Sequence, residues 1–245
     1  MENHWQEIWN NRKVNVDELS SEDETRMILE LKRIVGWDFY GKKSSVSVEE
    51  FKKEYNYLKE NLGLTDKTSA SVFEVGCGSG TNLYFFQKDG FEIGGSDYAE
   101  NLLDIAKKVI GVENFIECIT GEASELPTAI KYDTVFSAGV FSYFSDLNYT
   151  EKVLEKMVVK ARRSVGVLKI LDEATKEECL KYRRENTKNY DERYKGLPKL
   201  FHSKKFFEDF ALKNGLEIKF NKKHVEGYWN EAFNFDCFLY KKFSR

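Results

Sequence analysis

The segment from Val72 to Gly80 carries the residues whose types and spacing point most directly to chemistry. It reads Val-Phe-Glu-Val-Gly-Cys-Gly-Ser-Gly, a short apolar strand that runs into a glycine-rich turn. Glycine has no Cβ and tolerates positive φ, so such a turn lets a ligand come close to the backbone. We therefore expect Gly76, Cys77 and Gly78 to contact a bound cofactor.

Two acidic residues accompany this turn. Glu74 stands two residues before the first glycine, and Asp97 follows that glycine by 21 residues, at the end of the next expected strand. A carboxylate in the second position can accept hydrogen bonds from both hydroxyls of a ribose. The pattern therefore predicts a site for a cofactor that contains adenosine.

The third glycine separates the two kinds of adenosine cofactor that fit this layout. Dinucleotide enzymes use Gly-x-Gly-x-x-Gly, which needs glycine where Thr81 stands, whereas the glycine here falls one residue earlier, at Gly80. Glu74 would also repel a pyrophosphate, but it suits a ligand with an ammonium and a sulfonium group. The residues therefore favour a cofactor with a methionine tail, and a nicotinamide-dependent oxidoreductase is the rival enzyme class.

The sequence resembles the class I S-adenosylmethionine-dependent methyltransferases, whose first motif is a strand ending in Glu or Asp, one residue, and Gly-x-Gly-x-Gly. Residues 70–172 carry the resemblance. It implies S-adenosylmethionine as cofactor and S-adenosylhomocysteine as product, with Asp97 on the ribose and Tyr98 beside the adenine. Thr120-Gly121-Glu122-Ala123 is similar to the family's Gly-Asp-Ala, in which the acid meets the adenine amine and a backbone amide meets the ring.

Two further stretches extend the resemblance toward the methionine tail and the acceptor. Ser137-Ala138-Gly139-Val140 resembles the segment whose carbonyls receive the methionine ammonium, and Tyr143 falls where many relatives carry a histidine or tyrosine of the catalytic pocket. Short segments at 139–144, 200–203 and 228–238 also resemble small-molecule methyltransferases associated with bacterial surface polysaccharides.

The function implied by this resemblance is methyl transfer to a small molecule. We expect O-methylation of a sugar-linked or phosphorylated metabolite in surface-polysaccharide biosynthesis. The alternatives are an N-methyltransferase acting on a small amine, and a catalytically inactive protein that binds S-adenosylmethionine and acts by interaction. The oligomeric state is left open.

The acceptor side is expected to combine aromatic and polar side chains. Tyr228, Trp229 and Asn230 lie between the last two expected strands, where the fold places acceptor contacts. A hydroxyl acceptor must lose its proton, and the candidate bases are His202 and Tyr143, although core packing is the alternative reading of both. Tyr40, in the loop between two N-terminal helices, is a candidate lid over the cofactor.

Composition excludes several other classes. The net charge of −3 gives no broad field that would attract a nucleic-acid backbone. The four cysteines and three histidines show no metal-ligand spacing, so no metal site is expected. No apolar run approaches the roughly 18 residues of a membrane-spanning helix, and the first residues lack the layout of a signal peptide. A cytoplasmic protein with no membrane partner is therefore expected.

The elements that must position these residues follow from hydrophobic periodicity. Short apolar strands alternate with helices from residue 70, which is typical of an α/β fold with a parallel sheet covered on both faces. The resemblance implies a Rossmann-like seven-stranded sheet in the order 3-2-1-4-5-7-6, with the last strand antiparallel. Expected strands lie near 71–75, 91–96, 114–119, 132–137, 164–170, 216–221 and 233–241, and expected helices near 80–89, 98–109, 146–163 and 203–214.

The N-terminal part is expected to be helical. Apolar spacing predicts helices over 16–35 and 47–62, with capping boxes that begin at Ser21 and Ser47. We therefore divide the chain into a helical cap or lid over 1–65 and a catalytic domain over 66–245, which form one structural unit. Residues 173–200 are charged, and only their first part contains good helix formers.

Overall fold

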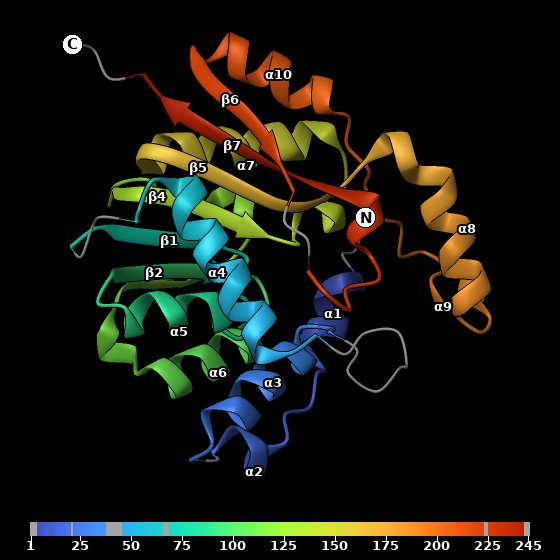
Figure 1. The fold of residues 1–245 in the computed structure, drawn as a ribbon, viewed down its shortest axis with the longest axis horizontal. Coiled ribbons are helices and arrows are strands. Elements are labelled where there is room, and N and C mark those ends of the chain that lie inside the picture. The colour runs from blue at the N-terminus through green and yellow to red at the C-terminus, as the bar shows by residue number, and fades with distance from the viewer. Residues whose placement is uncertain (1–3, 21, 38–45, 66–68, 223–224, 243–245) are drawn as a thin grey trace.

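A seven-stranded sheet with helices on both faces forms the centre of the molecule (Figure 1). The computed structural model describes residues 4–20, 22–37, 46–65, 69–222 and 225–242. The strand order is β3-β2-β1-β4-β5-β7-β6, and β7 alone runs in the direction opposite to the other strands. This is the order that the sequence led us to expect. The strands are β1 Ser71–Val75, β2 Glu92–Asp97, β3 Phe115–Thr120, β4 Tyr132–Ala138, β5 Ala161–Leu171, β6 Leu216–Asn221 and β7 Asn234–Lys241.

The helices divide into an N-terminal group, two layers on the sheet and an insertion between β5 and α10. The α-helices are α1 His4–Asn10, α2 Val16–Leu19, α3 Glu24–Ile34, α4 Val48–Leu62, α5 Thr81–Lys88, α6 Glu100–Ile110, α7 Leu147–Lys160, α8 Lys176–Asn186, α9 Tyr190–Arg193 and α10 Lys204–Lys213. The 3-10 helices are η1 Val112–Asn114, η2 Ala123–Glu125, η3 Phe141–Tyr143, η4 Glu173–Thr175 and η5 Glu231–Phe233.

Two apolar clusters hold the layers together, one on each face of the sheet. Phe51 of α4, Phe86 of α5 and Leu103 of α6 belong to the first cluster. Met157 of α7 and Phe207 of α10 belong to the second. All five side chains are almost completely buried. A parallel sheet covered on both faces needs continuously apolar strands, which explains the short apolar runs of the sequence.

Helix caps account for several boundaries. Ser47 accepts a hydrogen bond from the backbone N–H of Glu50 at the start of α4, as predicted, and Gly63 ends that helix with φ 72°. The start of α3 differs from the prediction because Asp23 caps it, accepting from the N–H of Thr25. Ser21, the expected cap, lies outside the described residues.

Other boundaries also differ from the sequence prediction. The helix expected over 16–35 is two helices, α2 and α3. Helix α7 ends at Lys160, because Ala161 already pairs with Tyr132 and begins strand β5. The short helix α1 was not predicted, and the insertion between β5 and α10 contains η4, α8 and α9.

The first three helices pack against α6 beside the carboxyl ends of the central strands. Trp5 and Trp9 of α1, one turn apart, share an apolar cluster with Leu31 of α3 and Leu102 of α6. In the part of the chain that the structure describes, no helix is both long and apolar enough to cross a membrane.

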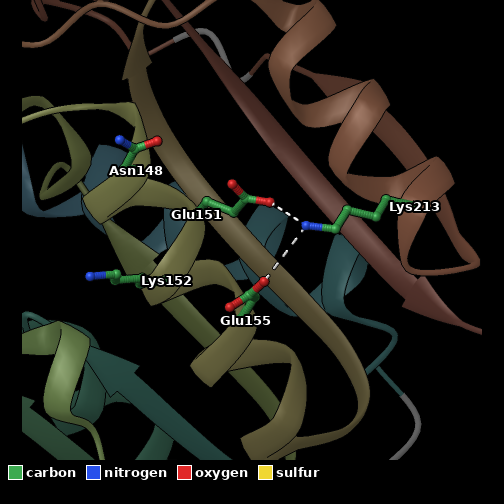
Figure 2. Close-up of a pocket in the computed structure, with 5 residues that line it drawn as sticks. All are labelled: Asn148, Glu151, Lys152, Glu155 and Lys213. Atoms are coloured by element: carbon green, nitrogen blue, oxygen red, sulfur yellow. Dashed lines mark hydrogen bonds and ion pairs between the residues drawn. The ribbon is translucent and has the colours of Figure 1, made fainter.

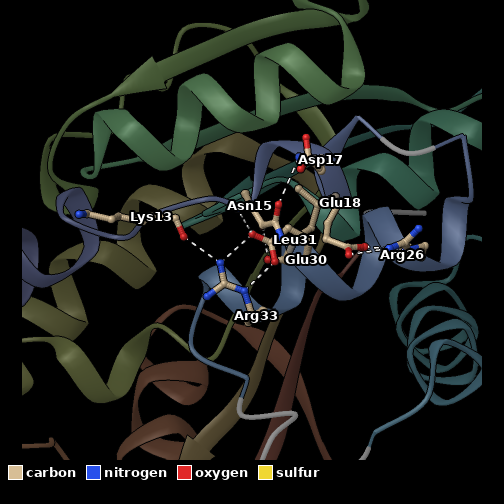
Figure 3. A network of polar contacts seen from close by, with 9 residues as sticks. Lys13, Asn15, Asp17, Glu18, Arg26, Glu30, Leu31 and Arg33 are labelled. Atoms are coloured by element: carbon tan, nitrogen blue, oxygen red, sulfur yellow. Dashed lines mark hydrogen bonds and ion pairs between the residues drawn. The ribbon is translucent and has the colours of Figure 1, made fainter.

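A polar network fixes the chain that connects α1 to α3 (Figure 3). The guanidinium of Arg33 donates to both carboxylate oxygens of Glu30, at 2.6 and 2.7 Å, and to the carbonyl of Lys13 at 2.8 Å. Glu30 also accepts from the backbone N–H of Asn15. Because Glu30 is buried, these bonds satisfy its charge and hold the segment before α2 against α3.

Candidate active site

The glycine-rich turn lies between β1 and α5. Its three glycines, Gly76, Gly78 and Gly80, have φ values of 72°, 52° and 78°, which favour glycine. A Cβ on Gly76 would lie 2.4 Å from a methyl group of Val140. The backbone N–H groups of Gly76 and Cys77 both donate to the carbonyl of Ser96. The turn is therefore fixed on the end of β2 in a conformation that larger residues cannot adopt without strain.

Glu74 is an ionisable residue in the buried strand β1. One carboxylate oxygen accepts from the side-chain amide of Asn82 at 2.7 Å, and Oε2 is buried with no hydrogen-bond partner among the described residues. Burial raises the pKa of Glu74 to about 8. Such an oxygen costs stability unless a donor reaches it, so its surroundings fit a cationic ligand group such as an ammonium.

Asp97 ends β2 and faces the same turn. Its carboxylate accepts from the backbone N–H of Gly78 at 2.7 Å and from that of Ala99 at 2.8 Å. Burial raises the pKa of Asp97, while these backbone hydrogen bonds act in the opposite direction. Tyr98 follows with a half-buried ring, and its hydroxyl is buried without a partner in the described chain. Asp97 and Tyr98 are thus neighbours at the end of β2. They are the residues expected to contact the ribose and the adenine.

Glu122 and Ala123 lie just after β3, the next strand along the sheet edge. Glu122 is exposed and accepts from the hydroxyl of Tyr149 at 2.6 Å. Ala123 begins the short helix η2. The sheet order β3-β2-β1-β4 places both residues at the same edge as the glycine turn, because the carboxyl ends of parallel strands meet there.

Ser137 and Ala138 end β4 on the other side of β1. The hydroxyl of Ser137 is buried and has no partner among the described residues, and Ala138 is half-buried. Gly139 then turns the chain with φ 73°, while its N–H donates to the carbonyl of Leu168. The end of β4 is thereby held beside the end of β5, next to the glycine turn.

Tyr143 lies in η3, directly after this turn, and its ring is enclosed by aromatic side chains from α1. The rings of Trp5 and Trp9 contact it edge-on, with centroids at 4.9 and 5.5 Å. The ammonium of Lys199 lies 3.0 Å from its ring centroid. Burial raises the pKa of Tyr143 above the ordinary tyrosine value, and Tyr228 adds to the effect. The hydroxyl is therefore protonated near neutral pH and can donate a hydrogen bond.

The surroundings of His202 are those of a core histidine. Its side chain is 0% exposed and lies among the rings of Phe141, Phe206 and Phe207. Nε2 is 3.0 Å from the hydroxyl of Thr150, and Nδ1 is buried with no partner in the described residues. Burial lowers the pKa of His202 to about 4. His202 is therefore not exposed to an acceptor in this structure, because the apolar cluster that contains Phe141 and Phe207 encloses it.

The three candidate acceptor residues before η5 contact different parts of the molecule. Tyr228 packs on Trp37 at 4.7 Å, and its hydroxyl accepts from the side-chain amide of Asn230 at 3.3 Å. Trp229 instead stacks on Tyr182 of α8, with a centroid distance of 5.5 Å and an interplanar angle of 6°. Tyr228 and Asn230 thus share one small cluster, and Trp229 joins the insertion. Tyr40, the expected lid residue, lies outside the described residues.

Sequence reasoning missed three lysines in this part of the molecule. One of them is Lys199, which contacts the ring of Tyr143. Lys169 at the end of β5 has a left-handed backbone with φ 58°, and its ammonium binds Glu54 at 2.6 Å and lies 5.5 Å from the ring of Tyr228. Lys32 of α3 is buried, which lowers its pKa to about 8, and Glu74 is among the charges that act on it. Single lysines in mixed sequence give no local pattern from which these positions could be recognised.

A surface pocket of about 360 Å³ lies away from this edge (Figure 2). It is formed by α7 and α10, and Lys213 crosses it to pair with Glu151 at 2.7 Å and Glu155 at 3.9 Å. None of the site residues predicted above lines it. Solvated ion pairs of this kind contribute little, so we do not regard this pocket as the active site.

Comparison with known proteins identifies the central part of the chain. Residues 72–163 match a family described as a methyltransferase domain. A stretch of 120 residues is 32% identical to the malonyl-acyl-carrier-protein O-methyltransferase of Acetivibrio thermocellus. This match covers 48% of the present chain and only 40% of that relative.

Solved structures share the fold over almost the whole chain. The magnesium protoporphyrin IX methyltransferase of Synechocystis PCC 6803, with bound SAH, gives a TM-score of 0.60 at 15% identity and covers 98% of this chain and 94% of its own. The plantazolicin methyltransferase BpumL gives 0.60 at 14% identity, with 98% and 99% covered. At such identities the likeness concerns the fold. Residues 72–163 therefore resemble a methyltransferase domain, and the predicted α/β fold is confirmed.

Proposed function

We propose that the protein transfers a methyl group from S-adenosylmethionine to a small molecule. The single observation that carries this proposal is the buried, unpartnered oxygen of Glu74 beside the glycine turn that Asp97 holds in place. It stands in a segment that matches the methyltransferase domain family. A buried acid and a second acid that could accept from a ribose, both beside one turn, suit a ligand with an ammonium at one end and an adenosine at the other.

The residues that would hold the cofactor lie on four neighbouring strand ends. Glu74 and the end of β4 at Ser137 and Ala138 would take the amino-acid part, and Asp97 would take the ribose hydroxyls. The adenine would lie between Tyr98 and the segment of Glu122 and Ala123, while Gly76, Cys77 and Gly78 would let the ligand approach the backbone. When bound, the cofactor supplies a sulfonium methyl group that a nucleophile can displace.

On the acceptor side, alignment is the main contribution that these residues can make. Holding two reactants in attack geometry contributes up to about 7–11 kcal/mol. The protonated hydroxyl of Tyr143 can orient the acceptor by donating a hydrogen bond, and Tyr228 and Asn230 offer further polar contacts. Because His202 is buried and has a lowered pKa, we assign it a packing role.

The acceptor that we propose is a hydroxyl of a sugar-linked or phosphorylated metabolite, as in bacterial surface-polysaccharide synthesis. The support for this finer proposal is the resemblance of short segments in the sequence. An amine acceptor would need no base at all if it is neutral, so the two classes differ in their dependence on a proton acceptor.

Calorimetry with defined ligands tests the proposed activity. We expect the protein to bind S-adenosylmethionine and S-adenosylhomocysteine and to show no binding of NAD or NADP. Asp97→Ala should weaken S-adenosylhomocysteine binding about tenfold or more, since charge-assisted hydrogen bonds contribute about 1.5–3 kcal/mol each. Asp104→Ala, which changes an exposed aspartate of α6, is the matched control and should keep the wild-type affinity. Equal affinities of a folded Asp97→Ala variant and the wild type would refute the assignment.

A further inference from the structure

Three cationic side chains gather around Tyr143 at the acceptor end of the site. The ammonium of Lys199 lies 3.0 Å from the ring centroid of Tyr143 and 4.4 Å from that of Trp5. The guanidinium of Arg12 lies 5.0 Å from the ring of Trp9, which itself packs on Tyr143. These two cations therefore lie at the same aromatic cluster, one in the segment after α1 and the other in the segment before α10.

Arg183 of α8 is the third cation of this cluster. Its guanidinium lies 4.9 Å from the ring of Trp229, and it donates to the side-chain oxygen of Asn230 at 3.4 Å. Arg183 and Arg12 both act to lower the pKa of Tyr143, so their charges reach the hydroxyl of that residue. The charges of all three side chains therefore lie near Tyr143, although Arg12 is far from Arg183 and Lys199 in the sequence.

The described residues provide no carboxylate within 4 Å of Arg12, Arg183 or Lys199. Arg184, the neighbour of Arg183, shows the usual alternative, because it is exposed and pairs with Asp191 at 3.1 Å. In contrast, Nε of Arg12 is buried without a hydrogen-bond partner among these residues. Burial together with the charge of Arg183 holds the pKa of Lys199 well below its usual value. Placing cations together in poorly hydrated surroundings without a counterion costs free energy, which an anionic ligand would offset.

We propose that Arg12, Arg183 and Lys199 bind an anionic oxygen group, a phosphate or a carboxylate, of the methyl acceptor. This inference rests on the proposed function, because it treats the surroundings of Tyr143 as the acceptor position. Two guanidinium groups and an ammonium offer several directed hydrogen bonds to such a group. The rings of Trp5, Trp9 and Trp229 would flank the remainder of the molecule.

Tryptophan fluorescence offers a direct test, because the fluorescent rings lie beside the cations. Protein saturated with S-adenosylhomocysteine is titrated with inorganic phosphate and, separately, with acetate, against sodium chloride at equal ionic strength. We expect a saturable change with phosphate or acetate, and the anion that binds more tightly identifies the group. Arg183→Gln and Lys199→Gln should each weaken that binding about tenfold or more. Arg184→Gln, the matched control on the same helix, should bind as the wild type does.

Three outcomes would overturn the proposal. The first is a response to phosphate and acetate that does not differ from the response to chloride. The second is an equal loss of anion binding in Arg184→Gln, which would indicate general surface attraction. The third is a loss of S-adenosylhomocysteine affinity in Arg183→Gln and Lys199→Gln similar to their loss of anion binding, which would assign the cations to the cofactor instead.

Two further measurements separate the possible causes of a negative result. Lys199→Arg retains the charge and should keep anion binding within about threefold, so it separates lost charge from lost packing if Lys199→Gln unfolds. If S-adenosylhomocysteine does not bind to the wild type, the proposed function fails. The anion titration of the protein without it then tests the cationic cluster separately.

Discussion

The two halves of the site are built in different ways. The proposed cofactor half, from Glu74 to Ala138, comes from one continuous stretch whose backbone N–H and C=O groups fix the glycine turn and Asp97. The acceptor half joins Trp5, Tyr143 and Lys199, which lie far apart in the sequence and meet through ring contacts. The first half is therefore specified by local chain geometry, and the second by packing of the whole molecule.

The largest effect is expected from a methyl group in the cofactor half. Gly76→Ala places a Cβ 2.4 Å from Val140 at a φ of 72°, so the turn must shift. Overpacking and backbone strain each cost about 1–3 kcal/mol, and we expect S-adenosylhomocysteine affinity to fall by about 100-fold or more by calorimetry. Gly90→Ala is the control, because its φ is 84° but nothing lies within 4 Å. A folded Gly76→Ala protein with nearly normal affinity would contradict this account of the turn.

An intermediate effect is expected from His202, which belongs to neither half if it is a core residue. His202→Ala should reduce the free energy of unfolding by about 2–4 kcal/mol at neutral pH, because it leaves a cavity among phenylalanine rings. The folded variant should bind S-adenosylhomocysteine as the wild type does. Urea unfolding at pH 7 and calorimetry measure the two quantities.

The pH dependence of stability separates the two roles of His202 more sharply. Its pKa is about 4 in the folded protein and near 6.5 when unperturbed, so the unfolded chain takes up the proton first as the pH falls. The wild type should therefore lose stability between about pH 6.5 and pH 4, and His202→Ala should lack that part of the loss. Identical pH profiles of unfolding in the two proteins would show that His202 is not buried as described.

The smallest effects are expected from two hydroxyl groups, one in each half. Tyr149→Phe removes the donor to Glu122 and should weaken S-adenosylhomocysteine binding roughly threefold. Tyr143→Phe keeps its ring against Trp5 and Trp9 and should leave this affinity unchanged within about twofold. Calorimetry on both variants, with melting curves as a check of folding, gives the comparison. A reversed order would mean that Tyr143 belongs to the cofactor half.

The fold could be predicted largely because its signals are local. Several strands of the sheet, such as β1, are short apolar runs. The caps Ser47 and Asp146 each accept a hydrogen bond from the backbone N–H three residues later. Errors occurred where a tertiary contact decides the boundary, as at Ala161, which pairs with Tyr132 and begins β5 early. Helix α1 was missed although Trp5 and Trp9 already stand one turn apart.

Local patterns indicate candidate residues more fully for the proposed cofactor half than for the proposed acceptor half, where Tyr143 and Tyr228 were named but Lys199 was not. Glycines and acidic residues at fixed distances from strand ends form a pattern that can be recognised from the sequence alone. In contrast, the burial of His202 depends on phenylalanines from η3 and α10, and the position of Lys199 depends on α1. No local pattern reports such contacts, which is why Lys199 was missed and why the sequence left both a catalytic and a packing role open for His202.

The position of helix α1 also determines when its contacts can form during synthesis. The indole N–H of Trp5 donates to the carbonyl of Pro198, 193 residues further along the chain. During synthesis on the ribosome, α6 emerges early and can receive one side of α1. Tyr143, Lys199 and Pro198 follow only much later, and contacts over such long separations form slowly. Helix α1 leaves the ribosome before these partners and is therefore among the last elements to find its complete set of contacts.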